Sequence, residues 1–141
     1  MTYEEELLFK DLCARIPTGV MLYCEVQRSD GYNTFKSFAN KKLKGITSDG
    51  KVEVEDGEKY DLCNVKPYLR SFNLMSDKEK DKLQMVFWKV KHHPFSSSEF
   101  AGFDFQCKEI IEYCINHMLD YNGLIGMRLA REATEEMYNN I

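Results

Sequence analysis

The sequence contains no hydrophobic run that approaches the roughly 20 residues of a membrane span. Residues 1–6 do not resemble a secretory signal, because they carry glutamates where a signal needs basic residues. Basic residues are not in excess either. The formal net charge is −4, so the chain as a whole is not attracted to nucleic acid or to acidic membranes. We therefore expect a cytoplasmic protein without a membrane partner.

Cysteine pairs of the usual spacing are absent as well. The five cysteines form an odd number, and no two of them have the C-x-x-C spacing of zinc ribbons and redox sites. Each lies beside or within an apolar pattern, so we interpret them as buried free thiols in a reducing compartment. They are Cys13, Cys24, Cys63, Cys107 and Cys114.

Catalytic signatures are also missing. There is no G-x-S-x-G, no H-E-x-x-H and no glycine-rich loop for phosphate. Cys107, Cys114 and His117 have the spacing of half a metal site, but both cysteines also belong to the apolar stripe of the predicted helix. Cys114, His117 and Asp120 could supply a nucleophile, a base and an acid, yet catalytic groups usually meet across a fold. We expect no metal and no cofactor, and enzyme activity is the less favoured hypothesis.

The composition that is present is typical of a globular domain. The chain has 141 residues, of which 43% are hydrophobic and 13% aromatic, enough for one core without disulfide support. We expect a single α+β domain spanning residues 1–141. Its predicted parts are an N-terminal helix at 1–17, a small β-barrel at 18–70 and a helical part at 71–141.

The first part shows signals for one helix followed by strands. Thr2 and Glu5 form a capping box that predicts a helix from residue 3, and Pro17 ends it. Residues 20–27 alternate between apolar and other side chains, which predicts a strand. Residues 32–38 are aromatic and predict a second strand, and a loop is expected at residues 39–42.

Two Asp-Gly pairs supply the positive φ angles that tight hairpin turns need. They predict three further strands, at residues 43–47, 51–55 and 59–63. In the middle one, Val52 and Val54 share the face toward the core. About five short antiparallel strands must curl to hide their edges, so we expect a five-stranded antiparallel SH3-like barrel. Its sheet should end, or run along an edge, near Pro67.

Three helices are predicted after the barrel. Ser76 and Glu79 form a second capping box, and the helix that follows has Leu83 on its apolar side. Residues 105–119 carry a clear apolar stripe, and residues 124–137 carry a weaker one. Self-association through this last, incomplete stripe is one partner hypothesis.

Four segments carry a resemblance to known sequences. They are LCARIPTGV at 12–20, VKPYLR at 65–70, Met75-Ser76, and DYNGLI at 120–125. In these four segments the chain resembles a group of small uncharacterised proteins found in gut Bacteroidales genomes and in their phages and mobile elements. The resemblance implies a bacterial or phage accessory protein. Because the group has no known activity, it assigns no catalytic residue.

These segments also mark a candidate partner-binding surface, where barrel and helices are expected to meet. Tyrosine, arginine and methionine carry much of the energy of protein interfaces. The candidate residues are Tyr68, Arg70, Met75, Asp120, Tyr121 and Arg128. The alternative interpretation is structural: Arg70 would pair with Asp120, and the tyrosines would close the joint.

A group of lysines suggests nucleic-acid binding as an alternative. The lysines are Lys36, Lys41, Lys42, Lys44 and Lys51, and the aromatic residues near them are Tyr32, Phe35 and Phe38. Small barrels bind nucleic acid with such loops and faces. However, a run rich in Asp and Glu follows at residues 53–61, and a hairpin would bring its carboxylates close to the lysines.

The sequence therefore favours a non-enzymatic module that binds another protein. One alternative is a small-barrel protein that binds nucleic acid. Another is a protein that sequesters a small ligand or nucleotide between barrel and helices, although no sequence feature selects it.

Overall fold

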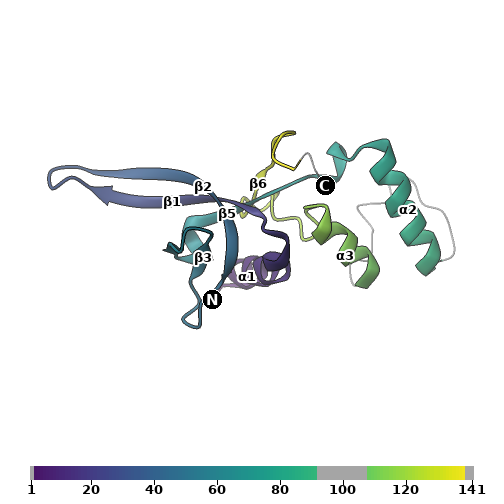
Figure 1. Cartoon of the computed structure of the whole chain (residues 1–141), viewed down its shortest axis with the longest axis horizontal. Helices are drawn as coiled ribbons and strands as arrows, with labels where there is room; N and C mark the ends of the chain where they lie inside the picture. The colour runs from purple at the N-terminus through teal and green to yellow at the C-terminus, as the bar shows by residue number, and fades with distance from the viewer. Residues whose placement is uncertain (1, 92–107, 139–141) are drawn as a thin grey trace.

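The computed structural model describes residues 2–91 and 108–138. The chain there forms one sheet, a helix lying on the sheet and a pair of helices beside it (Figure 1). The helices are α1 (Tyr3–Arg15), α2 (Asp77–Lys91) and α3 (Lys108–Asn116), with 3-10 turns η1 (Ile16–Thr18), η2 (Leu62–Asn64) and η3 (Phe72–Leu74). The strands are β1 (Met21–Ser29), β2 (Thr34–Ile46), β3 (Val52–Val54), β4 (Lys59–Tyr60), β5 (Val65–Leu69) and β6 (Arg131–Glu132). The predicted α+β class and N-terminal helix are confirmed.

The sheet has six strands in the order β4-β3-β2-β1-β5-β6. Neighbouring strands are antiparallel except β5 and β6, which run parallel with Tyr68 beside Arg131. Its outer strands β4 and β6 lie at opposite edges, so the sheet is open and mixed. The closed, five-stranded antiparallel SH3-like barrel that the sequence predicts is therefore not observed.

The long β1–β2 hairpin is the reason for this difference. β2 continues through residues 39–42, where a loop was expected, and it pairs with β1 at nine consecutive positions. A bulge between Leu43 and Gly45 then interrupts the register with β3. The hairpin consequently extends outward from the body in place of curling back on itself (Figure 1).

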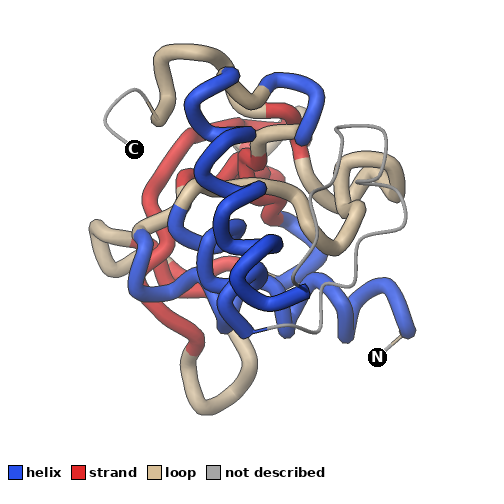
Figure 2. Tube along the Cα trace, turned by 90° about the vertical axis from the view of Figure 1, so that its right-hand side faces the viewer, coloured by secondary structure: helices blue, strands red, loops and turns tan. Residues whose placement is uncertain are grey.

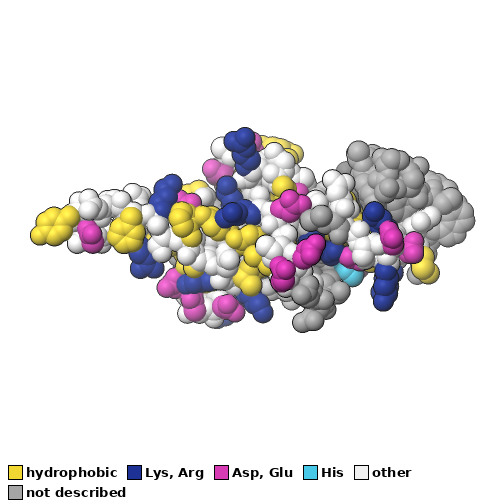
Figure 3. Space-filling view, turned by 90° about the horizontal axis from the view of Figure 1, so that it is seen from above, with side chains coloured by type: hydrophobic (Ala, Val, Ile, Leu, Met, Phe, Trp, Pro, Cys, Tyr) yellow, Lys and Arg dark blue, Asp and Glu magenta, His cyan; other side chains and the backbone are white. Residues whose placement is uncertain are grey.

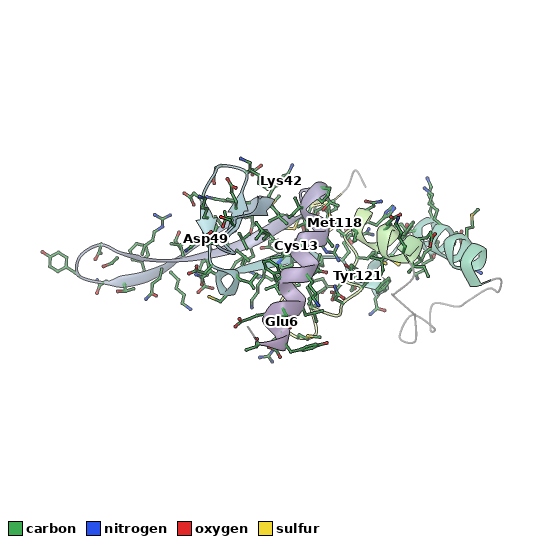
Figure 4. All side chains as sticks on the ribbon, turned by 90° about the horizontal axis from the view of Figure 1, so that it is seen from below. Glu6, Cys13, Lys42, Asp49, Met118 and Tyr121 are labelled. Carbon is green, nitrogen blue, oxygen red and sulfur yellow. The ribbon has the colours of Figure 1, made fainter. Side chains whose placement is uncertain are left out.

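Helix α1 begins and ends where the sequence predicts. The Thr2 hydroxyl accepts a hydrogen bond from the Glu5 backbone N–H at 3.2 Å, and the helix ends at Arg15, two residues before Pro17. Gly19 then adopts a φ of 64°, a left-handed conformation that glycine adopts without steric cost. Figure 4 shows α1 lying across one face of the sheet.

The main core fills the space between α1 and the sheet. It consists of Leu8, Leu12, Val20, Leu22, Cys24, Leu43, Val52, Val54, Tyr60, Val65, Leu69, Met118, Leu124 and Ala130. The predicted alternation in β3 is confirmed, because Val52 and Val54 are fully buried while Glu53 between them is partly exposed. The face of the sheet opposite α1 is called the outer face below.

A smaller second core joins α2 and α3. Its buried members are Met75, Leu83, Ile110, Cys114 and Leu119. The predicted capping box of α2 is present: Ser76 Oγ accepts from Glu79 N at 3.2 Å, and the Glu79 carboxylate accepts from Ser76 N at 3.3 Å. Figure 2 shows the helices in front of the sheet, as seen from their end of the molecule.

A buried ion pair connects α1 to the segment after α3. Asp11 and Arg15 are both fully buried, with Arg15 Nε 2.9 Å from the Asp11 carboxylate. Arg15 also donates to the Leu119 carbonyl at 2.6 Å, and the Asn122 side chain donates to Asp11 at 2.9 Å. In Figure 4 Tyr121 lies between α1 and α3, and the Arg15 guanidinium lies 5.3 Å from the centre of its ring.

The helix predicted at residues 124–137 is wrong. The Asp120 carboxylate accepts hydrogen bonds from the backbone N–H groups of Leu124 and Ile125, which forms a turn at the start of this segment. Arg128 has a φ of 63°, which a helix does not allow. The segment instead forms turns and β6, and the Ala133 N–H bonds to the Leu69 carbonyl at 2.8 Å.

The burial pattern of β3 gives a first test. We expect Val52→Ala to lower the free energy of unfolding by about 2 kcal/mol, because it removes two methyl groups from a packed core and leaves a cavity. Glu53→Ala should change it by less than about 0.5 kcal/mol, since Glu53 faces the other side and pairs with Lys44 only at 3.7 Å. Urea denaturation of both variants measures this. Equal losses in the two variants would contradict the assigned faces.

Candidate functional site

The six residues predicted as a partner surface do not form one surface. Tyr68 and Met75 are buried, in the sheet and in the second core, and Tyr121 packs against Arg15. Asp120 holds the turn that follows it. Arg128 is exposed. Most of this set therefore supports the fold.

Arg70 does not pair with the Asp120 side chain. Its guanidinium donates to both carboxylate oxygens of Glu79, at 2.6 and 2.7 Å, and to the His117 carbonyl at 3.1 Å. The connection to Asp120 is through the main chain, where Asp120 N donates to Arg70 O at 3.0 Å. Arg70 thus joins the end of β5 to α2 and to the residue after α3.

The lysines predicted for nucleic acid are mostly neutralised by carboxylates. Lys41 lies 2.7 Å from Asp56 and 2.9 Å from Glu58, and these contacts raise the pKa of Lys41. Lys36 pairs with Glu25 at 3.0 Å, Lys44 with Glu53 at 3.7 Å and Lys51 with Asp61 at 3.1 Å. Lys42 is exposed and has no ion pair within the described residues. The close carboxylates that the hairpin turns predict are therefore present.

The residues weighed for catalysis are not assembled into a catalytic site. Burial raises the pKa of the Cys114 thiol to about 12, which disfavours a nucleophilic thiolate. The Asp120 carboxylate is held by Leu124 and Ile125, and His117 stacks on Tyr113 at 4.2 Å. No three His, Cys, Asp or Glu side chains gather as a metal site in residues 2–91 and 108–138. Cys107 lies outside the described residues.

The outer face of the sheet carries a cluster that the sequence did not single out as a whole. Tyr23 of β1 is paired with Asn40 of β2 on one side and with Lys66 of β5 on the other. Phe38 stacks on Tyr23 with ring centres 5.4 Å apart, and the Tyr68 ring meets Tyr23 edge-on at 6.4 Å. Phe38 is 54% exposed. The centre of this face is thus aromatic and accessible to a partner.

One cation lies over these rings, and the strand register places two lysines, Lys42 and Lys66, on the same face. The Arg131 guanidinium lies over the Tyr23 ring at 4.3 Å and 5.8 Å from the Tyr68 ring. Within the described residues Arg131, Lys42 and Lys66 have no carboxylate partner. Figure 3 views the molecule from the side opposite α1 and shows basic and hydrophobic side chains together over the middle of the sheet. We call Tyr23, Phe38, Tyr68, Lys42, Lys66 and Arg131 the outer-face cluster.

Sequence reasoning could have placed Tyr23 in this cluster but not Arg131. The alternation of residues 20–27 already places Tyr23 on the face opposite Leu22, away from the core. Arg131 could not be placed, because residues 124–137 read as a helix and nothing in the sequence predicts the parallel pairing of β6 with β5.

The free end of the β1–β2 hairpin, residues 25–38, projects beyond the body and is called the arm (Figure 1). Beyond Cys24 none of the arm's side chains is buried. Tyr32 at its tip is 96% exposed and Phe35 48% exposed. Asp30 shapes the tip, since its carboxylate accepts from the backbone N–H groups of Tyr32 and Asn33, and these bonds lower the pKa of Asp30.

A shallow hollow of about 310 Å³ lies beside the start of α1. It is lined by Thr2, Glu4, Glu5, Leu8, Leu62, Cys63, Val65, Lys66 and Leu129. It lies between the start of α1 and β5.

Comparison with protein-family models, with curated proteins and with solved structures finds no match to this chain. Among the helices of the described residues, none has the length and apolar character needed to cross a bilayer.

The joint around Arg70 and Glu79 predicts a pH dependence of stability. His117 Nδ1 is buried, lies 3.8 Å from the Glu79 carboxylate and has no hydrogen-bond partner in the described residues. Desolvation, opposed by Glu79 and reinforced by Arg70 and Lys82, lowers the pKa of His117 below 6.5. The unfolded chain then binds this proton more readily, so the free energy of unfolding should fall as pH drops below about 6.5.

Urea denaturation at pH 7.5 and 5.5 measures this loss in the wild type and in His117→Gln. The variant should lose less stability between the two pH values, because its side chain does not titrate. The remaining histidines are present in both proteins and cancel in the comparison. The same loss in both proteins would contradict the assignment to His117.

Proposed function

We propose that this chain is a non-enzymatic protein-interaction module of bacterial or phage origin, and that it binds a partner through the outer-face cluster and the arm. One observation carries the proposal: the accessible aromatic centre formed by Tyr23 and Phe38 shares its face of the sheet with Lys42, Lys66 and Arg131, which have no carboxylate partner in the described residues. Tyrosine and arginine carry much of the binding energy of protein interfaces, and phenylalanine is enriched in them. The uncompensated charge of Lys42, Lys66 and Arg131 favours an acidic partner surface.

Nucleic-acid binding is the second candidate, and the same cluster favours it. Sheet faces with exposed aromatic side chains stack bases, and nearby cations contact phosphates. Two observations weigh against it. The Arg131 guanidinium already occupies one face of Tyr23, and two of the lysines on this side, Lys36 and Lys44, are ion-paired. The protein partner is therefore the leading proposal.

Affinity capture from host-cell lysate tests both candidates when nuclease-treated and untreated samples are run in parallel. We expect the wild type to retain a protein that survives nuclease, and Arg131→Ala to lower its recovery by at least about tenfold, as for an interface hot spot. Arg128→Ala is the matched control, because Arg128 is also exposed but lies outside the cluster. It should leave recovery unchanged.

Two outcomes would contradict the proposal. Recovery of nucleic acid, or of proteins only without nuclease, would place the second candidate first. Equal recovery by Arg131→Ala and the wild type would show that the outer face is not the binding surface. Substitution of Arg70 or Tyr121 is unsuitable here, since both residues make contacts that support the fold.

A further inference from the structure

The outer edge of β2 is open over most of its length. β1 pairs with β2 along residues 34–42, but on the other side β3 pairs only with Leu43, Gly45 and Ile46. Within the described residues no strand lies beside residues 34–41 on that side. A strand edge of this length presents a row of backbone donors and acceptors that can receive another strand.

The hydrogen bonds of β2 show which residues have their backbone groups on this edge. The Leu43 N–H bonds to Val20 O, toward β1, whereas the Lys42 carbonyl accepts from Glu55 N on the β3 side. Successive residues of an antiparallel strand direct their N–H and C=O groups to alternate sides. The backbone groups of Lys36, Phe38 and Asn40 therefore point to the open edge.

The side chains of these same residues lie on the outer face. Lys36, Phe38, Asn40 and Lys42 alternate with residues that face the other side of the sheet, and Phe38 belongs to the outer-face cluster. A strand added here would place alternate side chains beside them. Glutamate or aspartate would suit the position opposite Lys36 and the end of the segment nearest Lys42, and an apolar residue would suit the position opposite Phe38.

The charges along the open edge of β2 indicate which kind of segment would pair with it. Two copies of this chain pairing edge to edge would bring Lys36 and Lys42 of both copies close to one interface, and lysines on a strand edge are a recognised protection against self-pairing. An acidic segment from another protein meets the same lysines favourably. We infer that the partner binds as an additional β-strand on the open edge of β2, through an extended acidic segment with an apolar residue opposite Phe38. This inference rests on the proposed function and names the mode of binding.

The test uses the full chain and a synthetic peptide with glutamate at both ends, phenylalanine at an inner position, and valine and threonine elsewhere. Amide hydrogen exchange is followed by NMR. In the free protein the amides of Lys36, Phe38 and Asn40 should exchange fast and those of Ser37 and Ala39 slowly. Saturating peptide should slow the first three by at least about tenfold and leave the other two unchanged.

Controls separate strand addition from simple docking. A peptide with lysine in place of glutamate should not bind. Of two peptides N-methylated at alternate positions, one should bind and the other should not, because only one set of peptide amides faces the edge. Phe38→Ala should weaken binding about tenfold. Phe35→Ala, an exposed phenylalanine on the opposite face of the same strand, should weaken it less.

Each other outcome overturns the inference. Binding without protection of the three amides, with both methylated peptides active, would leave the proposed function standing and exclude strand addition. Protection that rises with protein concentration alone would identify a second copy as the occupant. Salt-sensitive binding of an oligothymidylate in place of the peptide would favour nucleic acid and count against both proposals. No binding of either probe at millimolar concentration would exclude the acidic strand, while the lysate capture still tests the proposed function.

Discussion

The buried ion pair between Asp11 and Arg15 is the contact on which the rest of the arrangement depends. Both side chains are withdrawn from water, and Arg15 also reaches the Leu119 carbonyl while Asn122 reaches Asp11. A buried pair of this kind adds little net stability, but loss of one partner leaves an uncompensated charge in the core and costs about 3–5 kcal/mol. Its effect here is positional: it fixes α1 against the turn that leads from the second core back to the sheet.

That position decides which face of the sheet remains available. Because α1 lies across one face of the sheet, the main core forms between the helix and that face. The aromatic rings and cations of the outer-face cluster lie on the opposite face. The turn after Asp120 then carries the chain back along β5, and Ala133 and Tyr138 attach it there. The Tyr138 hydroxyl accepts from Met21 N at 2.9 Å and donates to Tyr68 O at 2.8 Å. Arg131 reaches Tyr23 only because this segment follows β5. The outer-face cluster thus combines an early strand with the last described segment of the chain.

The sequence predicts the features that depend on neighbouring residues and misses those that depend on distant partners. The cap of α1, the alternation around Val52 and the glycine at each hairpin turn are local, and all are observed. The strand through residues 39–42 was missed because two adjacent lysines are typical of a loop. In the structure Asp56 and Glu58 of the next hairpin neutralise Lys41, and this contact is not visible in the local sequence. The helix predicted at 124–137 was wrong because its weak apolar stripe packs onto the sheet as a series of turns.

The lysines of β2 point to different faces of the sheet, and the face decides whether their charge is neutralised within the fold. Lys41 points to the same face as Leu22, and Asp56 and Glu58 hold it, so its charge is satisfied within the fold. Lys36 and Lys42 point to the outer face, where Lys36 has one partly exposed carboxylate partner, Glu25, and Lys42 has none in the described residues. An open edge lined in this way repels a second identical edge and attracts an acidic one. The charges that would disfavour pairing between two copies of this edge are therefore the same charges that would give a partner strand its specificity.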